Sequence, residues 1–202
     1  MLRVIVLVAT CAIVIIALPI GAAELDDAIS ALQNSDYATA QSIFHELAED
    51  GDADAQHNLG LMYANGVGVP QNDEEAVSWW RLAADQGYAP SQARLGEAYL
   101  LGAGVPLDYG AAVRWHRAAA EQEYPMAHYA LGMMYSQGVG LPYDILRAFM
   151  WYDLAASKST GELAVMASQF RDGAASSMTP EQIVEARAMA SRCEQSNFQD
   201  CD

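Results

Sequence analysis

Apolar and polar residues along this chain follow the period of an amphipathic helix. In the clearest segment, apolar side chains recur three and four positions apart at Ala55, Leu59, Met62 and Tyr63, which predicts one buried helix face. A short segment containing Gly and Pro follows, and a second helical pattern spans residues 76–84. This order predicts two helices joined by a tight connection, which is a helical hairpin.

The hairpin pattern occurs three times at a period of 36 residues, over 53–88, 89–124 and 125–160. Ten positions carry the same residue in all three copies, where composition alone would give fewer than about one. The recurring residues are Leu59, Leu95 and Leu131; Gly60, Gly96 and Gly132; Tyr63, Tyr99 and Tyr135; Gly66, Gly102 and Gly138; Gly68, Gly104 and Gly140; Pro70, Pro106 and Pro142; Ala76, Ala112 and Ala148; Trp79, Trp115 and Trp151; Ala83, Ala119 and Ala155; and Ala84, Ala120 and Ala156. We therefore expect an all-α fold, an α/α-solenoid of stacked hairpins.

Each copy also carries residues that begin and end helices. Gly66 follows the last periodic residue of the first helix, where a left-handed C-cap is favoured. Asn72, Asp108 and Asp144 precede the second helix of each copy and are good N-cap residues. Gly60 lies inside the first helix, where Gly costs about 1 kcal/mol relative to Ala. We expect a neighbouring helix to approach closely there, with the Trp of the second helix packed over the glycine.

The residues on both sides of the three copies match the repeat only in part. Residues 24–52 predict an N-terminal hairpin with a shorter turn, and Gly51 keeps the register of the repeat. Residues 161–202 predict C-terminal capping helices and a tail: residues 163–170 resemble a degraded first helix, and Thr179 begins a capped helix. Terminal units of a solenoid are expected to be atypical because one face has no neighbour.

The first 23 residues form a separate segment. A single positive charge at Arg3 precedes an uncharged, almost wholly apolar run over residues 4–20, and small residues follow up to Ala23. This order predicts a secretory signal peptide, residues 1–23, with cleavage after Ala23. The run is also just long enough to cross a bilayer, so an uncleaved anchor in the inner membrane is the alternative. Both interpretations place residues 24–202 outside the cytoplasm, either periplasmic or secreted.

The exported part is strongly acidic. All 26 Asp and Glu residues follow Ala23, whereas one of the ten basic residues is Arg3, so residues 24–202 have a formal charge of −17. Such a surface disfavours nucleic acid, whose binding needs a basic footprint, and anionic lipid surfaces. Acidity also keeps an exported protein soluble, and a partner with a basic face is the more specific interpretation.

Few groups in residues 24–202 are arranged for chemistry. Cys193 and Cys201 could form a disulfide in an oxidising compartment, which would attach the C-terminal tail to the last helix. Four histidines occur without metal-ligand spacing, and the acidic run 49–54 lacks the Gly and Glu that an EF-hand requires. No nucleophile elbow, phosphate-binding loop or dinucleotide fingerprint is present. We therefore predict no catalytic residue, metal ion or cofactor.

The recurring pattern resembles the Sel1-like repeat, a relative of the tetratricopeptide repeat with a longer loop between its helices. The first copy carries it as Leu59-Gly60, Tyr63, Gly66-x-Gly68-Val69-Pro70, Ala76, Trp79 and Ala83-Ala84, and two further copies follow at 36-residue intervals. The resemblance covers residues 53–160 strongly and 24–52 in part. It implies a right-handed superhelix with a concave binding face and a role as an adaptor. Residues 53–160 contain no Cys, so the branch of the family with a disulfide in each repeat is not matched.

The resemblance also implies which residues face a partner. The recurring Trp and Tyr residues are expected in the core, whereas first-helix positions that vary between copies would line the concave face. The candidate protein-binding residues are His57, Leu61, Ala93, Glu97, Met126, Tyr129 and Met133. Tyr129 and Met133, with Leu61, would give an apolar strip suited to a peptide.

The function expected from these observations is an exported adaptor that binds a protein or peptide on the concave face, without enzyme activity. A cell-envelope glycan-binding protein or hydrolase is one alternative, since acidic residues are abundant and paired carboxylates cleave glycans. A membrane-tethered structural spacer is a third possibility if the apolar N-terminus is retained.

Overall fold

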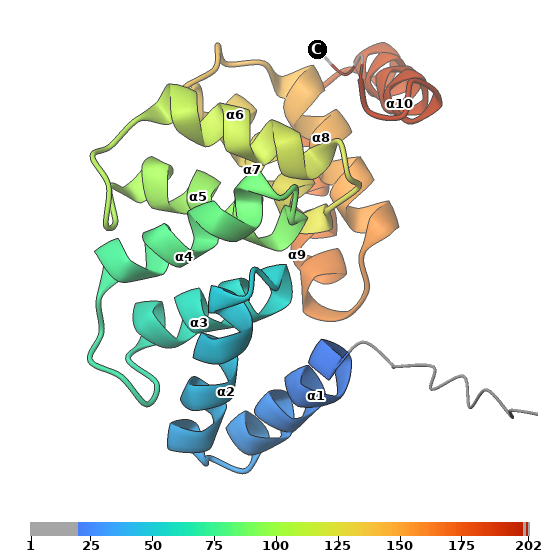
Figure 1. Ribbon diagram of the computed structural model, residues 1–202. Helices are drawn as coiled ribbons and strands as arrows, with labels where there is room; N and C mark the ends of the chain where they lie inside the picture. The colour runs from blue at the N-terminus through green and yellow to red at the C-terminus, as the bar shows by residue number, and fades with distance from the viewer. Residues whose placement is uncertain (1–19, 200, 202) are drawn as a thin grey trace, which may run out of the picture.

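The computed structural model describes residues 20–199 and residue 201, and these form ten α-helices and no strand (Figure 1). The helices are α1 (Ile20–Gln33), α2 (Tyr37–Glu49), α3 (Ala53–Asn65), α4 (Asp73–Asp85), α5 (Ala89–Leu101), α6 (Tyr109–Ala120), α7 (Pro125–Gln137), α8 (Ile145–Lys158), α9 (Gly161–Ala175) and α10 (Pro180–Gln195). The apolar run of the predicted signal peptide lies almost entirely in residues 1–19, outside the described residues. The predicted cleavage point after Ala23 falls in the first turn of α1.

The helices pair into antiparallel hairpins that stack in chain order. α3 packs against α4, α5 against α6 and α7 against α8, while α2–α3, α4–α5 and α6–α7 contacts join each hairpin to the next. Figure 1 shows this stack rising from α1 and α2 to α8 and α10. The expected all-α solenoid is confirmed. Within the described residues, no helix is both long enough and apolar enough to cross a membrane.

The predicted helix ends are also confirmed. Gly66, Gly102 and Gly138 close the first helices in the left-handed conformation, with φ of 66°, 70° and 68°. The side chains of Asn72 and Asp108 accept a hydrogen bond from the backbone N–H three residues later. These caps satisfy backbone groups that have no partner within the helix.

The glycine inside each first helix permits a close approach, but the side chain packed over it is not the recurring Trp. A Cβ atom on Gly60 would lie 2.4 Å from Trp80 Nε1, one on Gly96 2.7 Å from His116, and one on Gly132 2.7 Å from Tyr152. Each of these residues directly follows the recurring Trp in the sequence. Adjacent residues of a helix point about 100° apart, so the recurring Trp faces a different side of the helix from the residue that covers the glycine. The recurring Trp packs instead against the preceding hairpin, as Trp79 does against the cluster around Phe44.

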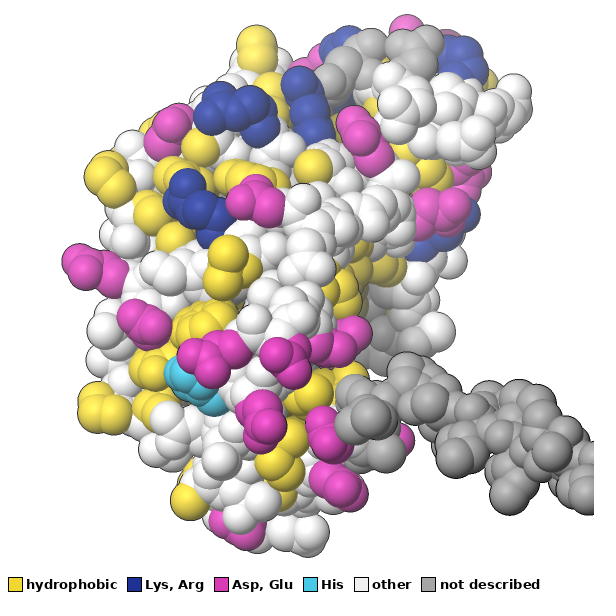
Figure 2. Space-filling model, viewed as in Figure 1, with side chains coloured by type: hydrophobic (Ala, Val, Ile, Leu, Met, Phe, Trp, Pro, Cys, Tyr) yellow, Lys and Arg dark blue, Asp and Glu magenta, His cyan; other side chains and the backbone are white. Residues whose placement is uncertain are grey.

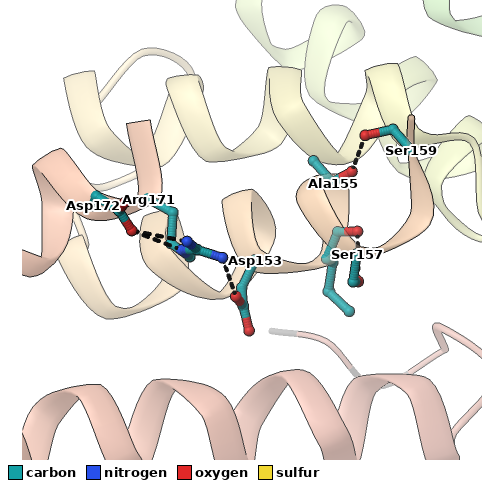
Figure 3. A network of polar contacts seen from close by, with 7 residues as sticks. Asp153, Ala155, Ser157, Ser159, Arg171 and Asp172 are labelled. Carbon is teal, nitrogen blue, oxygen red and sulfur yellow. Dashed lines mark hydrogen bonds and ion pairs between the residues drawn. The ribbon is translucent and has the colours of Figure 1, made fainter. Parts of the chain in front are cut away.

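The C-terminal helices cover the open end of the stack. α9 and α10 both pack against α8. Arg171 of α9 bonds to Asp153 of α8 through Nη1 at 3.2 Å and to the neighbouring Asp172 through Nη2 at 2.9 Å (Figure 3). A disulfide joins Cys193 at the end of α10 to Cys201 in the tail.

Candidate binding groove

A pocket of about 240 Å³ between α5 and α7 brings together five of the seven predicted partner-facing residues. Ala93 and Glu97 come from α5, and Met126, Tyr129 and Met133 come from α7. The remaining lining residues are Pro90, Arg94, Leu100, His116, Tyr124 and Ala130. The pocket is therefore mainly apolar and opens between two successive first helices.

The other two predicted residues lie on α3, one hairpin earlier, and do not line this pocket. His57 Nδ1 is 2.9 Å from Ser91 Oγ, and its ring centroid is 5.4 Å from that of Tyr88. Burial lowers the pKa of His57 to about 4, with a smaller contribution from Arg94. Leu61 is half-buried against the cluster around Trp80. Both residues help to join the first and second repeats, and their contact with a partner stays a prediction.

Similar pockets occur at three successive junctions, between α3 and α5, between α5 and α7, and between α7 and α9. The first, of about 180 Å³, includes Ala64, Trp80 and Glu97. The central pocket includes Leu100, His116 and Met133, and the third, of about 430 Å³, includes Ser136, Tyr152 and Gln169. Corresponding members of these sets are 36 residues apart, so the repeat itself generates the pockets. We call the surface formed by these three pockets the first-helix groove.

A cluster of three aromatic rings connects the central and third pockets. The ring centroids of Tyr129, Tyr152 and Phe170 lie 5.5 to 5.8 Å apart in all three pairings. Phe170 is 44% exposed and Met126 is 43% exposed, so the groove offers apolar surface to solvent. Scattered exposed apolar residues need no explanation, but a contiguous set within a groove is typical of a binding surface.

Comparisons with known proteins agree with this arrangement. The family model described as "Sel1 repeat" matches residues 53–88, 89–124 and 125–159, which is more than half of the chain. The chain belongs to the Sel1 repeat family. Among solved structures, it is 28% identical to a Sel1 repeat protein from Oxalobacter formigenes, with a TM-score of 0.67 over 87% of this chain and 72% of that one.

A second similar structure of the family is c5321, described as a protective antigen of uropathogenic Escherichia coli with an SLR fold. It is 27% identical with a TM-score of 0.65, and the match covers 88% of this chain and 46% of c5321, so the present chain spans less than half of that protein. No curated protein matches the chain.

Successive hairpins of this Sel1 repeat protein are joined by a polar contact that the sequence comparison missed. Gln56 donates to the carbonyl oxygen of Ala48 at 3.0 Å, and Gln92 donates to that of Ala84 at 3.3 Å. His128 takes the corresponding place, with Nε2 3.2 Å from the carbonyl oxygen of Ala120. Comparison of the repeats by identical residues does not find this position, because it is occupied by Gln, Gln and His in the three copies.

The charge of this Sel1 repeat protein is unevenly distributed. Residues 24–80 contain twelve acidic and no basic side chains, whereas residues 81–202 contain 14 acidic and nine basic ones. Figure 2 shows acidic side chains over the lower hairpins, while Lys and Arg lie over the upper half of the same view. At the central pocket, Arg94 and Glu97 form an ion pair with each other at 2.9 Å. The field therefore favours a partner that is basic toward the N-terminal hairpins.

The histidine on the wall of the central pocket is neutral at pH 7. Burial lowers the pKa of His116 to about 4, and the side chain is only 3% exposed. Over residues 24–199 and 201, no three His, Cys, Asp or Glu side chains gather as a metal site would require. The central pocket thus offers apolar surface, one Arg–Glu ion pair and a few neutral hydrogen-bonding groups, which suits recognition of a side chain or peptide.

Proposed function

We propose that this Sel1 repeat protein is an exported adaptor that binds a protein segment in the first-helix groove. Sel1 repeats generally mediate protein interactions. The observation that carries the proposal is the contiguous apolar surface formed by the central pocket and the ring cluster of Tyr129, Tyr152 and Phe170. Export rests on the apolar N-terminal sequence alone.

The groove and the charge distribution favour a peptide with two properties. Bulky apolar side chains would fill the pockets, where flexible Met126 and Met133 can adapt to their shape. Basic residues would lie toward the N-terminal hairpins, where residues 24–80 have no Lys or Arg. Charge complementarity of this kind fixes the direction of binding more than it adds affinity.

The alternative of a glycan hydrolase has less support from the groove. Hydrolysis of a glycosidic bond generally requires two carboxyl groups on either side of the bond. Glu97 is the one carboxylate that lines the central pocket, and in the first pocket Asp73 is the second, but Glu97 is already paired with Arg94. No feature of residues 24–199 and 201 favours the third possibility, a tethered spacer.

A random peptide library displayed on phage and selected on the purified protein tests the proposal. We expect enriched peptides to combine a bulky apolar residue with Lys or Arg. The Tyr129→Ala/Met133→Ala variant should weaken their binding about tenfold or more, because anchors in a buried pocket dominate binding energy. Binding is measured by titration of the synthetic peptides.

The matched control is Tyr143→Ala, which removes a tyrosine that is 65% exposed and does not line the groove. This variant should bind the peptides as the parent does, and all variants are checked by melting temperature. Equal binding to the parent and to Tyr129→Ala/Met133→Ala would refute the groove as the site. Failure to enrich any peptide would refute peptide binding.

A further inference from the structure

The middle repeat differs from its neighbours at the residue packed over the invariant glycine. The first and third repeats place large aromatic rings there, Trp80 and Tyr152, whereas the second has the smaller His116. All three residues also line a pocket of the first-helix groove. The three repeats can therefore be compared with one another, because the residue occupies the same position and contacts the same glycine in each, and only the ring differs.

The polar atom of each flanking ring has a partner inside the protein. Trp80 Nε1 donates to the carbonyl oxygen of His57 at 3.2 Å, and Tyr152 Oη lies 3.0 Å from Ser136 Oγ. His116 differs, because neither of its ring nitrogens has a hydrogen-bond partner among the described residues although the side chain is 97% buried. An unpartnered buried polar group destabilises a protein and calls for an explanation.

We propose that the pocket beside His116 receives a tyrosine or tryptophan side chain of the bound partner, whose hydroxyl or indole N–H hydrogen-bonds to the His116 ring. This inference rests on the proposed function, since the aromatic side chain belongs to the segment bound in the groove. The partner would supply to His116 the hydrogen bond that His57 supplies to Trp80 and Ser136 supplies to Tyr152.

The lining of the pocket supports an aromatic side chain with a polar tip. Ala93, Leu100 and Tyr129 present apolar surface to the body of a ring. Tyr and Trp combine such a body with one hydrogen-bonding group. The imidazole is shielded in the free protein, and Met126 and Met133 on the same pocket have the flexibility to move aside for the ring.

The charged groups near the pocket argue against an ionic ligand. Arg94 and Glu97 neutralise each other at 2.9 Å, and the remaining lining residues carry no charge at pH 7. A neutral imidazole offers one donor and one acceptor, which matches a hydroxyl or an N–H group better than a carboxylate. The chemistry therefore selects Tyr or Trp over Asp, Glu, Lys or Arg.

The test titrates the purified protein with four amino-acid amides while the ring signals of His116 are followed by NMR. The probes are N-acetyltyrosinamide, N-acetyltryptophanamide, N-acetylphenylalaninamide and N-acetylleucinamide. The Tyr and Trp probes should shift the His116 signals and bind about five- to tenfold more tightly than the Phe probe, which lacks a polar tip. Equal affinity of the Tyr, Trp and Phe probes, or no shift at His116, would overturn the proposal.

The matched variant is His116→Trp, which installs the residue found at this position in the first repeat. It should fold, because Trp80 occupies the equivalent place over Gly60, and it should abolish the preference for the Tyr and Trp probes over the Phe probe because the imidazole that bonds to their polar groups is gone. If His116→Trp does not fold, the relative affinities of the four probes for the wild-type protein still test the proposal.

The two proposals fail in different ways. In one outcome, the selected peptides depend on Tyr129 and Met133 but contain no Tyr or Trp, while the probes cause no shift at His116. This result would refute the aromatic pocket and leave the adaptor function standing. Probes that bind at His116, in a protein that enriches no peptide, would support the pocket and remove peptide binding as the function.

Discussion

Two buried histidines on neighbouring repeats should make the free energy of unfolding depend on pH. Burial lowers the pKa of both His116 and His128 to about 4, well below the ordinary value of 6.5. His116 lies over Gly96, and His128 stacks on Phe198 with ring centroids 5.1 Å apart. Both rings must therefore be neutral in the folded protein over the range in which the unfolded chain binds protons.

The free energy of unfolding should fall as the pH falls from about 6.5 toward 4. In this window the unfolded state binds protons that the folded state does not, and the effect stops below about 4. Each histidine should cost on the order of 2 kcal/mol at pH 5 relative to pH 7. Urea unfolding at both pH values measures the difference, and His116→Tyr should reduce it by the contribution of His116.

His116→Tyr also serves as its own structural control, because Tyr152 occupies the equivalent position in the third repeat. The charged and titratable groups that line the same pocket as His116 are the paired Arg94 and Glu97 and the tyrosines Tyr124 and Tyr129. None of these is replaced in the variant. An unchanged difference between pH 7 and pH 5 would show that His116 is not the group that titrates.

At the scale of elements, the second glycine of each loop lets one hairpin pack on the start of an earlier helix. Gly104 has a φ of +67°, and a Cβ atom there would lie 2.2 Å from the carbonyl oxygen of Asp73, the first residue of α4. Gly140 similarly approaches the backbone of Tyr109 at the start of α6, at 2.9 Å. The recurring Gly-x-Gly thus shapes the loop and also joins neighbouring repeats.

Gly104→Ala should therefore destabilise the protein by about 2 kcal/mol or more, because it combines a strained φ with a backbone clash. Gly173→Ala is the matched comparison: this glycine lies in α9, and an added Cβ would meet no atom within 4 Å. That variant should be neutral or stabilising by up to about 1 kcal/mol. Thermal unfolding of both variants gives the comparison, and equal effects would contradict the packing role of Gly104.

The sequence predicted the elements well because the repeat fixes them three times over. Gly and Asn or Asp residues recur at the helix ends, where Gly66 is a C-cap and Asn72 is an N-cap, and these roles can be predicted from the residue types. The contents of the groove were less predictable. The repeat register aligns Trp80, His116 and Tyr152, but only the structure shows that these side chains pack over the glycine. Because the residue at this position differs in every copy, a search for identical residues does not find it.

At the scale of the whole molecule, the C-terminal tail closes the solenoid through a covalent link. The disulfide between Cys193 and Cys201 encloses Phe198, which packs into the same apolar cluster as Trp151 and lies against His128. The Lys158 ammonium lies 5.7 Å from the Phe198 ring centroid. Together with α9 and α10, these contacts cover the third repeat.

Cys201→Ser should destabilise this closed end more than the rest of the stack. Loss of the short disulfide loop is expected to cost roughly 2–3 kcal/mol, since it frees the tail in the unfolded and partly opened states. Because each repeat contacts only its neighbours, hydrogen exchange should accelerate in α8 and α10 while α3–α6 keep their protection. Reduction of the wild-type disulfide with dithiothreitol should reproduce the pattern. Uniform acceleration across all the described helices would show instead that the solenoid opens as a single cooperative unit, and unchanged exchange would show that Phe198 stays docked without the disulfide.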